Sequence, residues 1–228
     1  MTELSFSELF ARALNGTPCT VIGAADASGD APEALPVGDW RRPAQKSDLA
    51  VLDLCEGVTI DVGCGPGRMA AALAERGHDV LAIDVVAESV RLARERGVVA
   101  MQHDVFEALP HEGRWTTVLL ADGNVGIGGD PATLLRRVRE LVEPRGRVVV
   151  DLAGPGVGIA SRWARLQCGD DVSRPFRWSV VGVDAIEDLA RAAGLEVLTL
   201  HVVDDDEDER WTAVLGNPAP ATGSGASS

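Results

Sequence analysis

The most constraining stretch of this sequence is residues 59–68 (TIDVGCGPGR), where an apolar run meets three closely spaced glycines. The apolar run predicts a buried strand, and the alanine-rich residues behind the glycines predict a helix that ends at Gly77. Gly63, Gly65 and Gly67 permit positive φ angles and carry no Cβ that would hold a ligand away from the backbone. The helix start behind them offers unpaired N–H groups and a positive dipole end. The stretch therefore predicts a strand, a tight turn and a helix that together bind a polar ligand.

The spacing of these glycines separates two classes of cofactor. A dinucleotide-binding turn has the spacing G-x-G-x-x-G, and its third glycine would fall on Arg68. The spacing present is G-x-G-x-G, and it is introduced by Asp61. This pattern resembles motif I of the class I S-adenosylmethionine-dependent methyltransferases, which is written (D/E)-x-G-x-G-x-G. The resemblance extends over residues 57–215.

Two further acidic residues follow predicted strands in the order that the resemblance requires. Asp84 comes directly after the segment 78–83 (HDVLAI), about 20 residues beyond the glycine turn, where α/β nucleotide folds bind ribose hydroxyls. Nicotinamide-binding folds share this feature, so Asp84 by itself indicates an adenosine cofactor of either kind. Asp104 follows the predicted strand 98–101, and in the methyltransferase family this position holds the adenine amino group. A solvated or capping aspartate explains either residue singly, but the series favours a cofactor site.

The resemblance implies S-adenosyl-L-methionine as the cofactor and S-adenosyl-L-homocysteine as its product. It assigns cofactor binding to Asp61, Gly63, Cys64, Gly65, Gly67, Asp84, Val85, Asp104, Val105 and Ala121. In the family, the residues just past Ala121 face the transferred methyl group. Asp122 is therefore the first candidate for a general base and His103 the second, if the acceptor has to lose a proton. Asn124, in the glycine-rich loop that follows, is a candidate for binding the acceptor, and a flexible turn is the alternative interpretation of this loop.

Strands and helices alternate along the middle of the chain, which predicts a parallel sheet with helices on both faces. The expected strands are 58–62, 79–83, 98–101, 115–120 and 146–151, and the expected helices between them are 67–76, 86–96 and 131–142. The resemblance implies an α/β, Rossmann-like, seven-stranded and mostly parallel sheet. Its antiparallel last strand, 211–215, would insert between the fifth strand and the sixth, 195–203.

The chain outside this sheet divides into three parts. Residues 1–56 predict an N-terminal cap, with extra helices at 6–14 and 47–56 and irregular structure between them. Residues 57–215 form the expected methyltransferase domain, and residues 216–228 have nothing to bury, so we expect a disordered tail.

Residues 154–183, after the fifth core strand, are an insertion that the core fold does not need. Segments 163–168 and 175–181 predict a hairpin across a Gly-Asp-Asp turn. Because the insertion leaves the carboxyl end of a parallel strand, where open α/β sheets bind ligands, we expect it to lie over the acceptor.

Two tryptophans of this insertion, Trp163 and Trp178, are candidate acceptor-binding residues, with help from the segment around Trp40. Phe176, Trp178 and Val180 alternate, so they share one strand face that suits the cover of a pocket. Packing within the hairpin explains the same aromatic residues equally well.

Composition excludes several classes of function. The chain has a net charge of −14, and nucleic-acid binding depends on neutralising phosphates, so we expect no nucleic-acid partner. No apolar run reaches membrane-spanning length, and the N-terminus lacks a basic leader, which predicts a cytoplasmic protein without membrane contact. The scattered cysteines predict reduced, buried thiols rather than a disulfide or a metal site. They are Cys19, Cys55, Cys64 and Cys168.

These observations favour an S-adenosylmethionine-dependent methyltransferase that acts on a small-molecule acceptor. A protein or nucleic-acid methyltransferase is the alternative. A non-catalytic S-adenosylmethionine-binding module and a nicotinamide-dependent oxidoreductase also stay open. Arg68 and the terminal antiparallel strand pair argue against the oxidoreductase.

Overall fold

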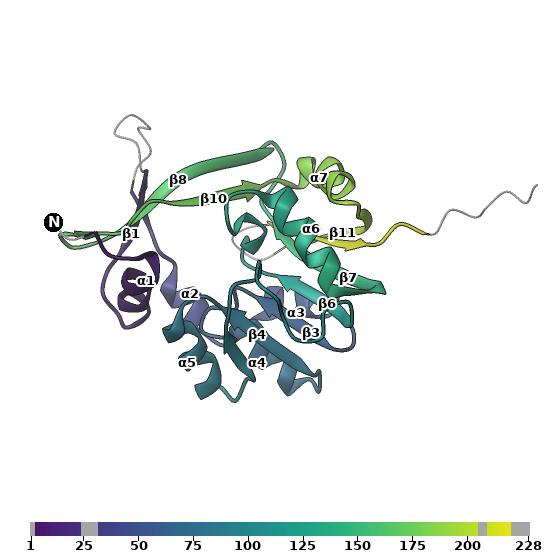
Figure 1. Cartoon of the computed structure of the whole chain (residues 1–228), viewed down its shortest axis with the longest axis horizontal. Coiled ribbons are helices and arrows are strands. Elements are labelled where there is room, and N and C mark those ends of the chain that lie inside the picture. The colour runs from purple at the N-terminus through teal and green to yellow at the C-terminus, as the bar shows by residue number, and fades with distance from the viewer. Residues whose placement is uncertain (1–2, 24–31, 205–208, 220–228) are drawn as a thin grey trace, which may run out of the picture.

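The computed structural model describes residues 3–23, 32–204 and 209–219, which contain two β-sheets (Figure 1). The larger sheet has seven strands in the order β11-β12-β7-β6-β3-β4-β5. Neighbouring strands from β7 to β5 are parallel, and β12 inserts antiparallel between β7 and β11. The strands are β3 (Thr59–Val62), β4 (Val80–Asp84), β5 (Ala100–Gln102), β6 (Trp115–Leu120), β7 (Val142–Leu152), β11 (Glu196–Asp204) and β12 (Glu209–Gly216). The predicted Rossmann-like sheet is confirmed.

Helices cover both faces of this sheet. The alternation along β6 and β7 shows it: Leu119 and Val149 pack with α3 and α4, whereas Val118 and Val150 pack with α6 and α7. The helix bounds are α3 (Lys46–Leu52), α4 (Arg68–Glu75), α5 (Ala87–Glu95), α6 (Pro131–Leu141) and α7 (Ile186–Ala193), with short 3-10 turns η1 (Asn124–Gly126) and η2 (Val183–Ala185). A helix packs on a sheet through an apolar stripe along one of its faces. The spacing of apolar residues that produces this stripe is also the pattern that predicted these helices.

A smaller sheet contains the predicted hairpin. β8 (Ile159–Cys168) pairs antiparallel with β10 (Phe176–Val181), and the short β9 (Asp171–Val172) folds back on β8 at the turn. The first strand is longer than the predicted segment 163–168, because its pairing with β10 runs back to Ile159.

The N-terminal segment supplies the rest of the smaller sheet. β1 (Thr20–Gly23) pairs antiparallel with β8, and β2 (Glu33–Ala34) pairs with β1. In Figure 1 the purple α1 (Phe6–Leu14) and β1 lie beside the green β8 and β10, although they are far apart in the sequence. The expectation of irregular structure between the two N-terminal helices was wrong for β1, β2 and α2 (Val37–Arg41). These elements are short and find their partners far along the chain, so the local pattern contains no sign of them.

Cys19 and Cys168 form a disulfide between the residue before β1 and the last residue of β8. The prediction of reduced thiols was therefore wrong for this pair, because a bond across 149 positions cannot be inferred from spacing. Cys55 and Cys64 are free, and burial raises the pKa of Cys55 to about 12 and that of Cys64 well above its ordinary value. Both thiols are neutral at physiological pH.

The described ranges hold neither a membrane-spanning helix nor a metal cluster. No helix there combines the length and the apolar character that crossing a membrane needs. No cluster of three or more His, Cys, Asp or Glu side chains in the same ranges could hold a metal ion. Most of the expected disordered tail, residues 220–228, lies outside the described residues.

Candidate functional site

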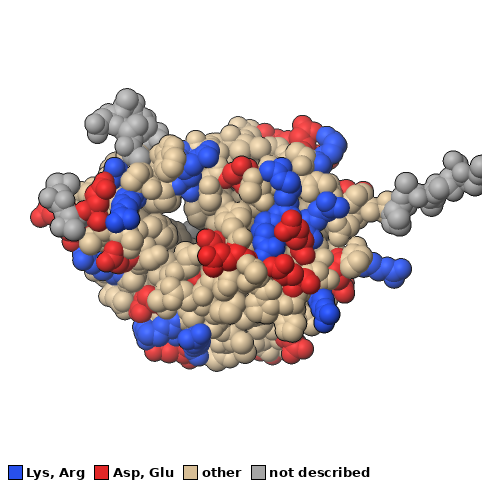
Figure 2. Space-filling model, in the orientation of Figure 1, with Lys and Arg blue, Asp and Glu red and all other residues tan. Residues whose placement is uncertain are grey.

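A cavity of about 680 Å³ lies between the two sheets, at the carboxyl ends of β3, β4, β5 and β6. The side of the cavity that the larger sheet forms is called the first wall. It consists of the ends of β3 to β6 and the loops that follow them. The second wall of the cavity comes from α1, α2, β1, β2, β8 and β10. Figure 2 shows the surface hollowed below the region of β8 and β10. Open α/β sheets bind ligands at this edge, so the insertion and the N-terminal segment together cover the expected site.

Most of the sequence-predicted site residues meet at this cavity. Those that line it are Gly63, Cys64, Gly65, Asp84, Val85, His103, Asp104, Val105, Asp122, Asn124 and Trp178. Asp61, Gly67, Ala121 and Trp163 do not line it. Ala121 is buried, and its carbonyl accepts a hydrogen bond from the Asn124 N–H at 2.9 Å. Eleven of the predicted site residues thus share one cavity surface, and the other four do not reach it.

The glycines of the turn differ in what surrounds them. Gly65 has a φ of +52°, and a Cβ built there would meet no atom within 4 Å, so it faces open space at the cavity. A Cβ on Gly67 would lie 2.7 Å from the Cβ of Ala93 in α5. Gly67 is therefore required for the close approach of α4 and α5, whereas Gly65 leaves room for a ligand.

Asp84 fixes the glycine turn to the end of β4. Its Oδ2 accepts a hydrogen bond from the Gly65 N–H at 2.9 Å, and its Oδ1 accepts one from the Val86 N–H at 2.8 Å. Burial raises the pKa of Asp84, and these two hydrogen bonds oppose that rise. A carboxylate has about four acceptor sites, so two oxygens with one backbone donor each can still accept hydrogen bonds from a ligand.

Asp61 lies beneath the cavity, with 1% of its surface exposed. Its Oδ2 has no hydrogen-bond partner among the described residues. Burial, followed by the nearby charges of Asp122 and Asp84, raises the pKa of Asp61 to about 7, and Arg68 opposes the rise. The carboxyl group therefore changes charge near neutral pH without touching the cavity.

His103 and Asp104 stand together on the first wall. The His103 Nδ1 lies 2.9 Å from the Asp104 carbonyl oxygen, which can only accept a hydrogen bond. Nδ1 therefore carries the proton, and in the neutral ring Nε2 carries the lone pair. The Asp104 Oδ1 accepts a hydrogen bond from the Phe106 N–H at 3.0 Å, which holds this carboxylate at the end of β5.

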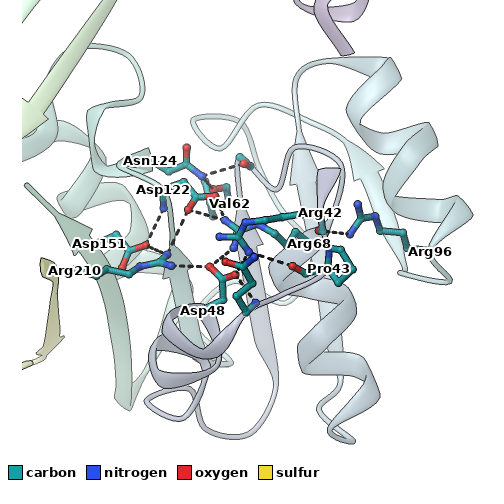
Figure 3. Close-up of polar contacts among 12 residues, drawn as sticks. Arg42, Pro43, Asp48, Val62, Arg68, Arg96, Asp122, Asn124, Asp151 and Arg210 are labelled. Carbon is teal, nitrogen blue, oxygen red and sulfur yellow. Dashed lines mark hydrogen bonds and ion pairs between the residues drawn. The ribbon is translucent and has the colours of Figure 1, made fainter. Parts of the chain in front are cut away.

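Asn124 links the loop after β6 to the glycine turn. Its Nδ2 donates to the carbonyl oxygens of Val62 and Gly63, each at 2.9 Å (Figure 3). Both amide protons are thereby used, which leaves the Oδ1 acceptor as the polar group that Asn124 offers to a ligand. The residue predicted to bind the acceptor also positions the turn.

The glycine-rich loop after Asn124 passes directly against β10. A Cβ on Gly126 would lie 1.8 Å from the Ser179 carbonyl oxygen, and one on Gly129 would lie 2.4 Å from the Arg177 Cβ. Ile127 forms an isolated antiparallel bridge with Trp178. Gly126 and Gly129 are thus explained by contact between this loop and β10, which joins the first wall to the second.

Replacing Gly126 by Ala is expected to lower the free energy of unfolding by about 1–3 kcal/mol, the usual cost of overpacking. The new methyl group would meet backbone, so η1 and β10 would have to separate. Urea unfolding measures the change. Gly38→Ala is the control, because a Cβ there meets nothing within 4 Å. Equal effects of the two substitutions would contradict the close contact.

A network of ion pairs lies beside the cavity (Figure 3). Asp48 in α3 is fully buried, and it pairs with Arg42 at 2.5 Å, with Arg210 at 2.6 Å and with Arg68. Arg68, at the start of α4, donates from Nη2 to both carboxylate oxygens of Asp122, at 2.8 and 2.6 Å. The network therefore ties the N-terminal segment and the motif I helix to the end of β6.

The network continues to the end of β7. Arg210 of β12 contacts Asp122 at 3.3 Å and also pairs with Asp151. The Asp151 Oδ2 accepts a hydrogen bond from the Asp122 N–H at 2.9 Å. Both oxygens of Asp122 are thus engaged by guanidinium groups, and accepting a substrate proton would compete with those bonds. Sequence reasoning missed this role of Arg68, because its partners Asp48 and Asp122 come from two segments that are distant in the sequence.

The second wall follows the two-residue period of its strands. Arg162, Ala164 and Leu166 of β8 line the cavity, and so do Phe176, Trp178 and Val180 of β10. The shared face predicted for the three β10 residues is confirmed. Their register explains it, because Phe176 pairs with Ala164 and Trp178 with Arg162.

Trp163 lies on the opposite face of the hairpin. It is 56% exposed, and the guanidinium carbon of Arg177 lies 5.8 Å from its ring centroid. The prediction that Trp163 contacts an acceptor therefore does not hold at this cavity. Residues 163 and 164 point to opposite faces of β8, so the pairing register was needed to decide which one lines the cavity.

Sequence reasoning also missed Phe6 and Phe10, which line the cavity from α1. Their spacing of four residues indicated only an apolar helix face that packs on a core. The scarcity of aromatic residues in the chain, 4% of the sequence, was the available signal that two rings on one helix face have a special role.

Comparison with known proteins agrees with this geometry. The sequence matches a family described as "Methyltransferase domain" over residues 20–200. It is 33% identical over 111 residues to the malonyl-[acyl-carrier protein] O-methyltransferase of Salmonella typhimurium, which covers 46% of this chain and 43% of that protein. It is also 33% identical over 148 residues to the trans-aconitate 2-methyltransferase of Rhodococcus jostii, which covers 60% of this chain and 54% of that protein. The chain spans about half the length of the curated relatives it matches.

A solved structure of similar fold is the SAM-dependent methyltransferase from Bacteroides fragilis in complex with S-adenosyl-L-homocysteine. The two chains are 22% identical, with a TM-score of 0.75 over 93% of this chain and 94% of that one. At this identity the likeness shows the fold. The family match extends over far more than half of the sequence, so the chain belongs to the methyltransferase-domain family, as the resemblance of its motif I predicted.

Proposed function

We propose that this chain transfers a methyl group from S-adenosyl-L-methionine to a small-molecule acceptor. The observation that carries the proposal is a single cavity in which the motif I turn, Asp84 and Asp104 face an apolar second wall. Membership of the methyltransferase-domain family supports the reaction class. The S-adenosyl-L-homocysteine bound to the Bacteroides fragilis relative supports the cofactor.

The residues on the first wall suit this cofactor. Gly65 leaves open space where a side chain would otherwise stand. The Asp84 carboxylate, held by two backbone N–H groups, is suited to accept hydrogen bonds from ribose hydroxyls. Asp104 is suited to accept one from the adenine amino group. When bound, S-adenosyl-L-methionine supplies a methyl group that is already activated by a positively charged sulfur.

The protein's main contribution is alignment. Holding the acceptor in line with the methyl group removes translational and rotational freedom before the reaction, which can supply roughly 7–11 kcal/mol of barrier reduction. The second wall keeps water from the reacting atoms. Where the acceptor has to lose a proton, the Nε2 of His103 is the better-suited base, because both oxygens of Asp122 accept hydrogen bonds from Arg68.

The other functions considered fit the geometry less well. The second wall covers the cavity, and the net charge of −14 repels phosphate, both of which favour a small molecule over a nucleic acid. Arg68 stands where a dinucleotide-binding turn needs a glycine, and it is held in buried ion pairs. A cytoplasmic location stays a prediction, and the Cys19–Cys168 disulfide weighs against it because such bonds are rare in a reduced cytosol.

Replacing Asp84 by Ala is expected to weaken S-adenosyl-L-methionine binding about ten- to a hundredfold, since charge-assisted hydrogen bonds contribute roughly 1.5–3 kcal/mol. Isothermal titration calorimetry measures the dissociation constants. Asp188→Ala is the control, because that carboxylate is 90% exposed and pairs with Arg191 of its own helix. An unchanged constant for Asp84→Ala removes this residue from the site. Binding of NADH by the parent protein as tight as that of S-adenosyl-L-methionine would contradict the proposed function.

A further inference from the structure

The aromatic side chains of this protein gather at one cavity. The chain has five Trp and four Phe residues, all of them within the described ranges. Five of these nine line the cavity, namely Phe6, Phe10, Trp40, Phe176 and Trp178. Each of the five is only half-buried, whereas Trp115, in the core, is 4% exposed. Aromatic side chains are scarce in this protein, and most of them have part of their ring surface exposed at the cavity.

Four of these rings form a continuous series. The ring centroids of Trp40 and Phe10 lie 5.5 Å apart, those of Phe10 and Phe6 lie 5.2 Å apart, and those of Phe6 and Phe176 lie 4.8 Å apart. Trp178 follows on the same face of β10 as Phe176. Aromatic faces and edges carry opposite partial charges, so such a series favours a further ring in a stacked or edge-on position.

The charged side chains of the second wall either form an ion pair or are directed away from the cavity. Among the described residues they are Glu33, Arg162 and Arg177. Arg162 pairs with Glu33 at 3.1 Å. The guanidinium of Arg177 lies over the ring of Trp163, which is on the opposite face of the hairpin. Glu33 thus offsets the charge of Arg162, and Arg177 is directed to the other face, so the second wall offers little net charge to an anionic acceptor.

The polar groups of the cavity are concentrated on the first wall. Asp84, His103, Asp104, Asp122 and Asn124 all belong to it. Under the proposed function Asp84 and Asp104 bind the cofactor, so the ring of the acceptor is left with the second wall. A ligand there gains affinity from ring contacts rather than from charge.

We propose that the methyl acceptor is an uncharged aromatic compound with a ring hydroxyl, bound by stacking on Phe6, Phe10, Trp40, Phe176 and Trp178. This inference rests on the proposed function. The hydroxyl oxygen bonds to the methyl carbon while the carbon–sulfur bond breaks and its electron pair returns to sulfur. The hydroxyl proton passes to the Nε2 of His103 and then to solvent.

Three matched probes test the class of acceptor, each added to protein saturated with S-adenosyl-L-homocysteine. 2-Naphthol is the uncharged aromatic alcohol, 2-naphthoate replaces its hydroxyl by a carboxylate, and decahydro-2-naphthol removes its aromaticity. Calorimetry is expected to give at least tenfold tighter binding for 2-naphthol than for either of the others. Equal or tighter binding of 2-naphthoate overturns the uncharged character, and equal or tighter binding of decahydro-2-naphthol overturns the aromatic one. Absence of 2-naphthol binding overturns the proposal as a whole.

Variants of the second wall test the location. Phe10→Ala and Trp178→Ala are expected to weaken 2-naphthol binding at least tenfold and to leave S-adenosyl-L-homocysteine binding within twofold. Trp163→Ala is the matched control, a tryptophan of the same hairpin on its opposite face, and should change neither. Retained S-adenosyl-L-homocysteine binding shows that a variant is folded.

The outcomes separate this inference from the function on which it rests. A parent protein that binds neither S-adenosyl-L-methionine nor S-adenosyl-L-homocysteine contradicts the proposed function. A parent that binds the cofactor, with Trp163→Ala and Trp178→Ala losing 2-naphthol equally, overturns only the inference about the second wall.

Discussion

Replacing Asp48 by Ala is expected to lower the free energy of unfolding by about 3–5 kcal/mol, the usual cost of removing one partner from a buried ion pair. Asp48 has no exposed surface, and it is shared by Arg42, Arg68 and Arg210. Its loss would leave Arg68, whose side chain is 4% exposed, with a buried charge that is only partly compensated. Urea unfolding followed by circular dichroism measures the change.

Asp53→Ala is the control for this experiment. Asp53 follows α3, in the same region, but its carboxylate is 60% exposed and pairs with Arg76 on the surface. Exposed ion pairs contribute about 0–1 kcal/mol, so the control should unfold nearly as the parent does. A similar loss in both variants would mean that the network does not stabilise the fold.

The network also predicts how stability depends on pH. Burial works to raise the pKa of Asp48, but hydrogen bonds from Arg68, the Gln45 N–H and Arg42 outweigh it and hold that pKa well below its usual range. A carboxyl group whose pKa is lower in the folded state stabilises that state above its unfolded pKa of about 3.9 and loses this contribution as the pH falls. The difference in unfolding free energy between the parent and Asp48→Asn should therefore shrink as the pH falls below about 4. A difference that stays constant would contradict the coupling.

Replacing Gly65 by Val is expected to weaken S-adenosyl-L-methionine binding by more than about a hundredfold, or 2.7 kcal/mol and above on the scale of about 1.4 kcal/mol per tenfold. No protein atom lies within 4 Å of the position that a Cβ would take, so the branched side chain would fill ligand space instead of disturbing the core. The left-handed φ of +52° costs a residue with a Cβ roughly 1–2 kcal/mol, which a stable fold survives. Calorimetry gives the affinity, and thermal unfolding gives the stability.

Gly97→Val separates these two effects. Gly97 has a φ of +81° and also has no atom within 4 Å of a built Cβ, but it follows α5 and does not line the cavity. The control should lose similar stability and keep its affinity for the cofactor. If Gly65→Val binds as well as the control does, the motif I turn has been misinterpreted.

The sequence was most informative where structure follows from local pattern. The strand at residues 115–120 was predicted with its observed bounds, because a short apolar run between turn signals is typical of a buried parallel strand. The start of α6 is equally local, since Asp130 precedes Pro131 at the first helical position and its side chain accepts a hydrogen bond from the Thr133 N–H at 3.0 Å. Central strands and amphipathic helices can be predicted because the spacing of apolar residues that defines them lies within a short stretch of sequence.

Features that depend on distant segments were the ones that the sequence left undetermined. Trp163 and Trp178 looked alike as ring-bearing residues of one hairpin, and only the register of β8 with β10 separates the exposed one from the one at the cavity. Asp122 follows a core strand, as a base would, but Arg68 and Arg210 from distant segments occupy its carboxylate. Motif I predicted part of the first wall, whereas the second wall depends on pairing between residues 20–34 and residues 159–181.

That pairing has a consequence for the order in which the molecule is made. β1 joins residues 20–23 to residues 164–167, so α1 and β1 leave the ribosome long before their partner strand exists. The βαβ units of the larger sheet form from neighbouring segments and need no such wait. Until β8 and β10 emerge, Phe6 and Phe10 have no sheet to cover them. During synthesis the nascent chain can therefore assemble the first wall of the cavity early, while the apolar face of α1 stays uncovered until the last third of the protein is made.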